Sequence, residues 1–147
     1  MIARLSGTLV DRSAADVVID CNGVGYEVRC SAYTLNQLPA LGERVVLRVY
    51  THASENSVSL FGFFDAAERA LFDHLITVKN VGPTTASTIL GGSTPRDIAT
   101  LISREDVGGL TRIKGVGKKT AELLVVELRE KCELLLLSWN ASGEVRA

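Results

Sequence analysis

The stretch RIKGVGKKTAELLVVEL, residues 112–128, decides the fold of the second half of the chain. Gly115 and Gly117 stand two positions apart, directly before a run of apolar residues with helical spacing. Glycine permits positive φ and close approach to the backbone, and the first amides of a helix lack internal partners. Because these amides and the helix dipole attract anions, the stretch predicts a turn that binds a backbone phosphate.

The same pattern occurs earlier in the chain. Residues 75–90 align with residues 110–125, an offset of 35 positions, which matches Val81 with Val116, Asn80 with Gly115, Gly82 with Gly117 and Ala86 with Ala121. A repeat near this length is expected of a duplicated helix-turn-helix unit. One glycine pair before a helix is weak support for a binding site, whereas two copies at a fixed offset are hard to explain as unrelated turns.

The second copy is also locally basic. The whole chain of 147 residues carries 16 Lys+Arg and 17 Asp+Glu, so no overall field attracts nucleic acid or an anionic membrane. Arg112, Lys114, Lys118 and Lys119 nevertheless lie in a segment, 112–119, that contains no acid. We expect binding to phosphates rather than to base edges, and therefore without sequence preference.

The first half of the chain has the period of strands. VVIDCNGVGYEVRC, residues 17–30, contains two β-rich runs around Asn22-Gly23, a dipeptide that favours a two-residue hairpin turn. Further alternating runs bring the total to about five short strands, which suits a small closed barrel. The period becomes helical at Asp65, so we predict a barrel domain over residues 1–64 and a helical domain over 65–137.

Several other kinds of site are not expected. Cys21, Cys30 and Cys132 have no C-x-x-C spacing, and His52 and His74 have no partner at metal-ligand or catalytic spacing. The chain has no run of about 20 apolar residues and no signal-peptide pattern at its start, so we expect a cytoplasmic protein without a membrane segment.

The segment GVGKKT is similar to the end of a nucleotide-binding P-loop. That pattern requires glycine where Arg112 stands and Ser or Thr where Lys119 stands. We therefore expect no nucleotide site, no cofactor and no catalytic residue, so that any energy-consuming step belongs to a partner.

Five segments together resemble the RuvA family, the Holliday-junction-binding subunits of bacterial branch-migration complexes. They are MIARLSGTLV (1–10), NGVGYEV (22–28), LFGF (60–63), VGPTTA (81–86) and GVGKKTAELL (115–124). The resemblance runs from Met1 to about Lys131. It implies an α+β chain with an N-terminal five-stranded barrel of the oligonucleotide-binding (OB) type, followed by an all-α domain with two helix-hairpin-helix motifs.

The resemblance also implies which residues contact DNA. Matched motif by motif, the DNA-binding residues are Val81, Gly82, Thr84, Gly115, Gly117, Lys118 and Lys119. Glu55 corresponds to an acidic pin that helps to part strands at the junction centre. The implied partners are four-way junction DNA, three more copies in a tetramer or seven in an octamer, a RuvB-type AAA+ motor and a RuvC-type resolvase, acting in recombination, repair and the SOS response.

Some positions depart from the family pattern. A second acid is usual where Asn56 stands, glycine where Asn80 stands, and a basic residue where Thr84 and Leu123 stand. Residues 138–147 are expected to begin a flexible linker. Nothing after Lys131 resembles the family's third, motor-binding domain, which favours a fragment.

Two rival interpretations remain open at this point. The first is a monomeric barrel and helix-hairpin-helix module that binds single strands or DNA in general, although the chain is only 5% aromatic and such binding uses stacking rings. The second is a glycosylase or nuclease, since such enzymes also carry helix-hairpin-helix motifs, although the acids of the helical half are scattered.

Overall fold

The computed structural model describes residues 1–142 and divides the chain into two compact units, Met1–Ala66 and Ala67–Ala147. The boundary lies two residues beyond residue 64, where the change of period placed it.

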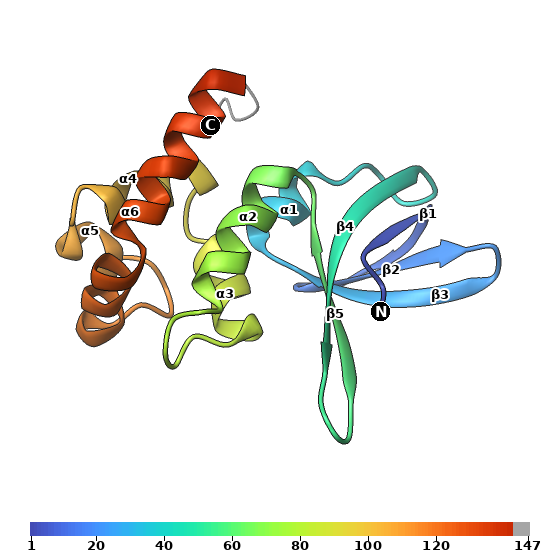
Figure 1. Cartoon of the computed structure of the whole chain (residues 1–147). Coiled ribbons are helices and arrows are strands. Elements are labelled where there is room, and N and C mark those ends of the chain that lie inside the picture. The colour runs from blue at the N-terminus through green and yellow to red at the C-terminus, as the bar shows by residue number, and fades with distance from the viewer. Residues whose placement is uncertain (143–147) are drawn as a thin grey trace. The chain divides into compact units, whose positions relative to one another are not determined.

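The first unit is a closed five-stranded barrel (Figure 1). Its strands are β1 (Arg4–Arg12), β2 (Asp16–Cys21), β3 (Val24–Cys30), β4 (Arg44–Ala53) and β5 (Val58–Phe63). They follow the order β1-β2-β3-β5-β4, and β4 pairs antiparallel with β1 to close the barrel. Only the contact between β3 and β5 is parallel. The predicted α+β class with an N-terminal five-stranded barrel is therefore confirmed.

Alternation along the strands fills the barrel interior. In β4, Val45, Leu47 and Val49 are buried while Arg44, Val46 and Arg48 are exposed, as the period of two requires. The interior is completed by the buried residues Leu5, Leu9, Val17, Ile19, Val28, Cys30 and Leu35.

Local sequence explains two features of the barrel. Asn22 and Gly23 both have positive φ, 53° and 94°, which confirms the predicted hairpin turn. The short helix α1 (Ala32–Gln37) was not predicted, although Ser31 caps it by accepting a hydrogen bond from the Thr34 amide at 3.1 Å.

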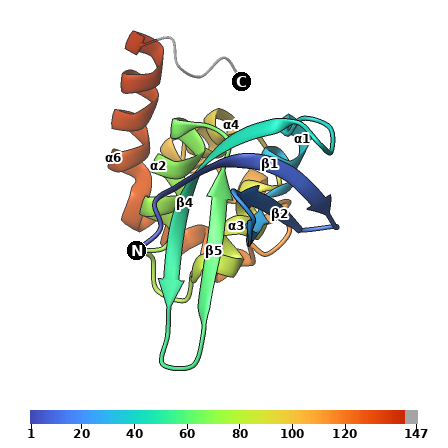
Figure 2. The same cartoon turned by 90° about the vertical axis from the view of Figure 1, so that its right-hand side faces the viewer.

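The β4–β5 hairpin continues beyond the other strands of the barrel (Figure 2). Its end is closed by a hydrogen bond from the Ser54 amide to the Ser57 carbonyl oxygen at 2.8 Å. Glu55 and Asn56 form the exposed tip between these two serines.

The second unit contains five helices within the described residues: α2 (Ala66–Leu75), α3 (Pro83–Leu90), α4 (Pro95–Ser103), α5 (Val107–Thr111) and α6 (Lys118–Ser142). Thr94 caps the start of α4, because its side chain accepts a hydrogen bond from the Asp97 amide at 3.1 Å. α4 and α6 form the main packing contact of this unit. No helix within residues 1–142 is both long and apolar enough to span a membrane.

The prediction that a linker begins at residue 138 is wrong for residues 138–142. α6 continues to Ser142, and Trp139 near its end is only 3% exposed. Burial of this large ring favours helix over linker at that point. Residues 143–147 of the expected linker lie outside the described residues.

We predict that Gly7→Ala destabilises the barrel by about 1–3 kcal/mol, the usual range for overpacking. A Cβ at Gly7 would lie 2.3 Å from the Asp20 carbonyl oxygen of the paired strand, so the backbone must move. Urea unfolding followed by tyrosine fluorescence measures the change, since Tyr26, Tyr33 and Tyr50, the only three tyrosines, lie in the barrel. Ser59→Ala, at an exposed position of β5, is the control. Equal stability of the two variants would contradict the close packing of Gly7 against β2.

A second prediction concerns Cys132, which is fully buried on α6 and whose pKa desolvation raises to about 12. Between about pH 9 and 12 the unfolded thiol loses its proton while the folded thiol keeps it, so folding stability falls as pH rises. The slope approaches about 1.4 kcal/mol per pH unit. Urea unfolding between pH 7 and 10.5 measures it, and Cys132→Ala should lose this part of the slope. An unchanged slope in the variant would contradict the assignment.

Candidate nucleic-acid interface

The two repeated turns have the same backbone hydrogen bonds. In the first copy the Val81 amide donates to Val78 O at 3.0 Å, and in the second the Val116 amide donates to Ile113 O at 3.1 Å. Both valines are buried, at 4% and 5% exposure, and anchor their turns to the helical core. The predicted duplication is thus present in the geometry as well as in the sequence.

Each turn leads directly into a helix. The Ala86 amide donates to Gly82 O at the start of α3, and the Ala121 amide donates to Gly117 O at the start of α6, both at 2.9 Å. Both alanines are completely buried, which explains a small side chain at this position. Gly82 and Gly117 are therefore the last residues before the helices and carry exposed backbone.

The positive φ angles of the turns fall on other residues than Gly82 and Gly117. Asn80 has φ 71° and Gly115 has φ 91°. Asparagine tolerates this region better than most residues with side chains, so the departure at Asn80 keeps the turn intact. Gly82 has φ −92°, and Gly117 is not in the positive-φ region either.

The surroundings of these two glycines are open. A Cβ built on Gly82 or Gly117 would meet no atom within 4 Å. In contrast, a Cβ on Gly115 would lie 3.5 Å from Thr88 Cγ2, which brings the second turn beside α3 of the first copy. The second turn therefore lies beside the C-terminal part of α3, the helix that follows the first turn.

The charge is concentrated at the second turn, as predicted. Lys118 and Lys119 are exposed in the first turn of α6, and neither forms an ion pair with any residue in the described part of the chain. Thr84 is exposed at the corresponding place on α3, where its carbonyl oxygen accepts a hydrogen bond from Thr88 Oγ1 at 3.1 Å. The first turn offers amides, and the second offers amides and cations.

Glu55, the expected acidic pin, belongs to the barrel unit. It stands at the exposed tip of the β4–β5 hairpin beside Asn56, so the tip carries one carboxylate. The hairpin gives this carboxylate a two-stranded support that extends away from the barrel (Figure 1).

Neither histidine forms part of a metal cluster in the described residues. Burial, and after it the charge of Lys131, lowers the pKa of His74, while the charge of Asp73 acts in the opposite direction. His52 is exposed on β4 and its ring stacks beside Tyr50.

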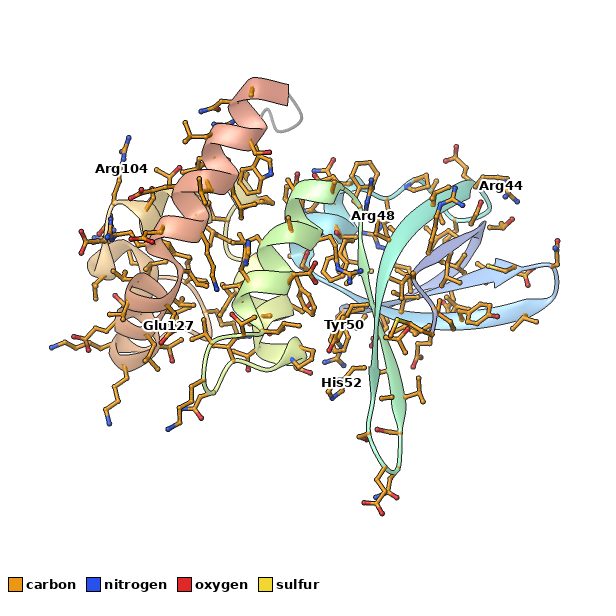
Figure 3. The ribbon with its side chains drawn as sticks, viewed as in Figure 1. Arg44, Arg48, Tyr50, His52, Arg104 and Glu127 are labelled. Atoms are coloured by element: carbon orange, nitrogen blue, oxygen red, sulfur yellow. The ribbon has the colours of Figure 1, made fainter. Side chains whose placement is uncertain are left out.

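The structure also assembles a group of side chains to which the sequence pattern gave no role. Arg44 and Arg48 lie on β4 (Figure 3), and Arg4 lies on β1, directly opposite Arg48. Arg44 and Arg48 are 40 or more positions from Arg4 along the chain, so only strand pairing brings the three arginines together.

Comparison with known proteins gives the same division of the chain. The model for the RuvA N terminal domain matches residues 1–62, and the model for the SAM-like helix-hairpin-helix tandem matches residues 72–130. Two relatives, each a Holliday junction branch migration complex subunit RuvA, match over all 147 residues. The one from Acidobacterium capsulatum is 45% identical over 74% of its own length, and the one from Anaeromyxobacter sp. is 46% identical over 73% of its own length. The chain belongs to the RuvA family.

Proposed function

We propose that this chain binds four-way DNA junctions through the paired helix-hairpin-helix turns and holds them open for branch migration by a separate ATPase motor. The DNA-binding residues are those of the two turns: Val81, Gly82, Thr84, Gly115, Gly117, Lys118 and Lys119. The proposal agrees with the names of the relatives, which are subunits of such a complex.

The observation that carries the proposal is the open space at Gly82 and Gly117. Neither residue needs glycine for its own φ, and neither would clash with the rest of the chain if it carried a Cβ. A glycine that the fold does not require is explained by a partner that must approach the backbone closely. At the start of a helix, where the amides point outward, that partner is an anion.

The charges of the second turn favour a polymeric anion. Lys118 and Lys119, with Arg112 and Lys114 before them, give four exposed cations in one segment, and none of them forms an ion pair within residues 1–142. A row of cations matches successive phosphates along a nucleic-acid backbone. Because the amides of both turns contact phosphate oxygens, binding is independent of base sequence.

Selectivity for a junction then arises from assembly. Four copies arranged around a centre would present four pairs of turns to four arms, which one phosphate site cannot do. An exposed apolar surface supports association: on α6, Val126 is 79% exposed, Leu134 66% and Leu137 65%.

The remaining parts of the proposal follow from the family. Glu55 at the hairpin tip repels phosphate and helps to keep duplexes from passing the centre unopened. With Asn56 beside it, this repulsion comes from one carboxylate at the tip instead of two. Motor and resolvase partners of the RuvB and RuvC types, a cytoplasmic location and a non-catalytic role belong to the same proposal.

We predict that Lys118→Ala/Lys119→Ala lowers affinity for a synthetic four-way junction and reduces the salt slope by about 0.9 for each phosphate that the variant no longer neutralises. Gel-shift titrations across a salt series, with linear duplex alongside, measure both quantities. Lys131→Ala/Arg104→Ala removes two exposed charges elsewhere in the helical unit and is the matched control. Equally weakened binding in both variants, or no preference of the parent chain for the junction, would contradict the proposal.

A second prediction separates the close approach of a phosphate to the backbone from the charge of the lysines. Asparagine is a good residue before a helix and meets no atom at position 117, so Gly117→Asn should change the melting temperature by less than about 2 °C. Its side chain should nevertheless block the phosphate and weaken junction binding at least about tenfold. Gly115→Ala is a control for a change that affects folding: because φ is 91° at this position, alanine should lower the free energy of unfolding by about 1 kcal/mol. Unchanged junction affinity in Gly117→Asn would remove the main support for the phosphate site.

A further inference from the structure

The outer surface of β4 carries an ordered row of side chains that the helical turns do not explain. Arg44, Arg48, Tyr50 and His52 follow one another along the strand towards the hairpin tip (Figure 3). Since alternate residues of a strand share one side, all four lie on the outer face, opposite the buried Val45, Leu47 and Val49. From Arg44 to His52 this row is roughly 26 Å long.

A third arginine joins the row from β1. Arg4 is the direct antiparallel partner of Arg48. The chain just before Arg4 is also held against β4, because the Ile2 amide donates to Thr51 Oγ1 at 2.9 Å and the Ile2 carbonyl accepts from the same hydroxyl at 2.6 Å. We call Arg4, Arg44, Arg48, Tyr50 and His52 the β4 row.

The arginines of the β4 row lack acidic partners in the described residues. No ion pair includes Arg4, Arg44 or Arg48, and Arg44 only donates to Ser6 Oγ at 3.2 Å. Like charges directly opposite each other on neighbouring strands are destabilising, so the Arg4–Arg48 pair costs stability unless an anion lies between them. The nearby Glu43 is engaged elsewhere, since its Oε2 accepts from the Ala40 amide at 3.0 Å.

Aromatic rings continue the row beyond the arginines. The Tyr50 and His52 rings are stacked, with centroids 6.3 Å apart and planes at 24°. His52 is exposed, so its ring is accessible to a further flat group. Cations followed by rings that can stack on bases are the two components of single-strand binding surfaces.

We propose that the β4 row is a binding site for single-stranded DNA, separate from the duplex phosphate site of the helical turns. The arginines contact successive phosphates, and the His52–Tyr50 ring pair stacks on an unpaired base. This site goes beyond the proposed function, because it binds a DNA strand whose bases are no longer paired with the complementary strand. The hairpin places the rings near Glu55, so a strand parted at the tip would enter the row at His52.

Stacking on these rings requires a DNA strand whose bases are unpaired. In duplex DNA the base faces are covered by their neighbours and cannot stack on a side chain, whereas in a single strand they are open. The exposed Val46 between Arg44 and Arg48 would suit the surface of a second copy as well. The test below therefore distinguishes binding of a second copy from binding of single-stranded DNA.

The test is binding of a fluorescent 12-nucleotide oligothymidylate and of a 12-base-pair duplex to the full chain. For Arg4→Gln/Arg48→Gln we expect oligothymidylate affinity to fall at least tenfold. Its salt slope should fall by about 1.4, which is two phosphates at about 0.7 each. Duplex affinity should stay within about twofold of the parent. The matched control is Arg104→Gln/Lys131→Gln, which should leave both affinities unchanged.

The ring pair has its own variants. His52→Ala should weaken oligothymidylate binding about fivefold or more, as removal of one stacked base predicts, whereas His52→Phe should retain binding. Because His52 is exposed, neither change should disturb the barrel. Equal effects of the two substitutions would overturn the stacking role.

Two further outcomes would overturn the proposal. The first is equal single-strand affinity of Arg4→Gln/Arg48→Gln and the Arg104→Gln/Lys131→Gln control. The second is a decrease of oligomer mass in sedimentation for the arginine variant with unchanged single-strand affinity per chain, which would assign the row to an interface between copies. Lys118→Ala/Lys119→Ala separates this proposal from the junction proposal, because it should keep oligothymidylate binding even where duplex binding is abolished.

Discussion

The helical unit depends on one backbone hydrogen bond between residues three positions apart, made once in each repeat. The Val116 amide donates to Ile113 O, and the Val81 amide donates to Val78 O. This bond turns the chain so sharply that the valine side chain enters the core while the following glycine remains outside with its backbone exposed. The turn itself therefore determines where the helix begins and which amides are open, before any charged side chain contributes.

Much of this arrangement is readable from the sequence because it is local. The Asn22-Gly23 turn, the cap at Thr94 and both glycine turns depend on residues within a few positions of one another. The helix α1 and the length of α6 were missed for different reasons: a single serine cap gives a weak signal in a strand-rich region, and the burial of Trp139 depends on tertiary packing. Local patterns predict turns and caps well, and long-range packing poorly.

The two basic surfaces likewise differ in whether the sequence alone reveals them. Lys118 and Lys119 are neighbours in sequence, so their clustering is visible in the printed chain. The β4 row gathers Arg4 and Arg48 through the pairing that closes the barrel, and no sequence window contains both. A chain with a net charge of −1 thus concentrates cations on two surfaces, while ion pairs such as Asp16–Arg29 and Arg69–Asp73 neutralise charge elsewhere.

The repeat also permits a comparison inside one molecule. The buried valine, the open glycine and the buried alanine are common to both copies, and they accompany the shared backbone of the turn. The copies differ in the residues that begin the following helix, which are Pro83-Thr84 in the first copy and Lys118-Lys119 in the second. The two turns are therefore alike in backbone and unequal in charge, so under the proposed function only the second would make DNA binding depend strongly on ionic strength.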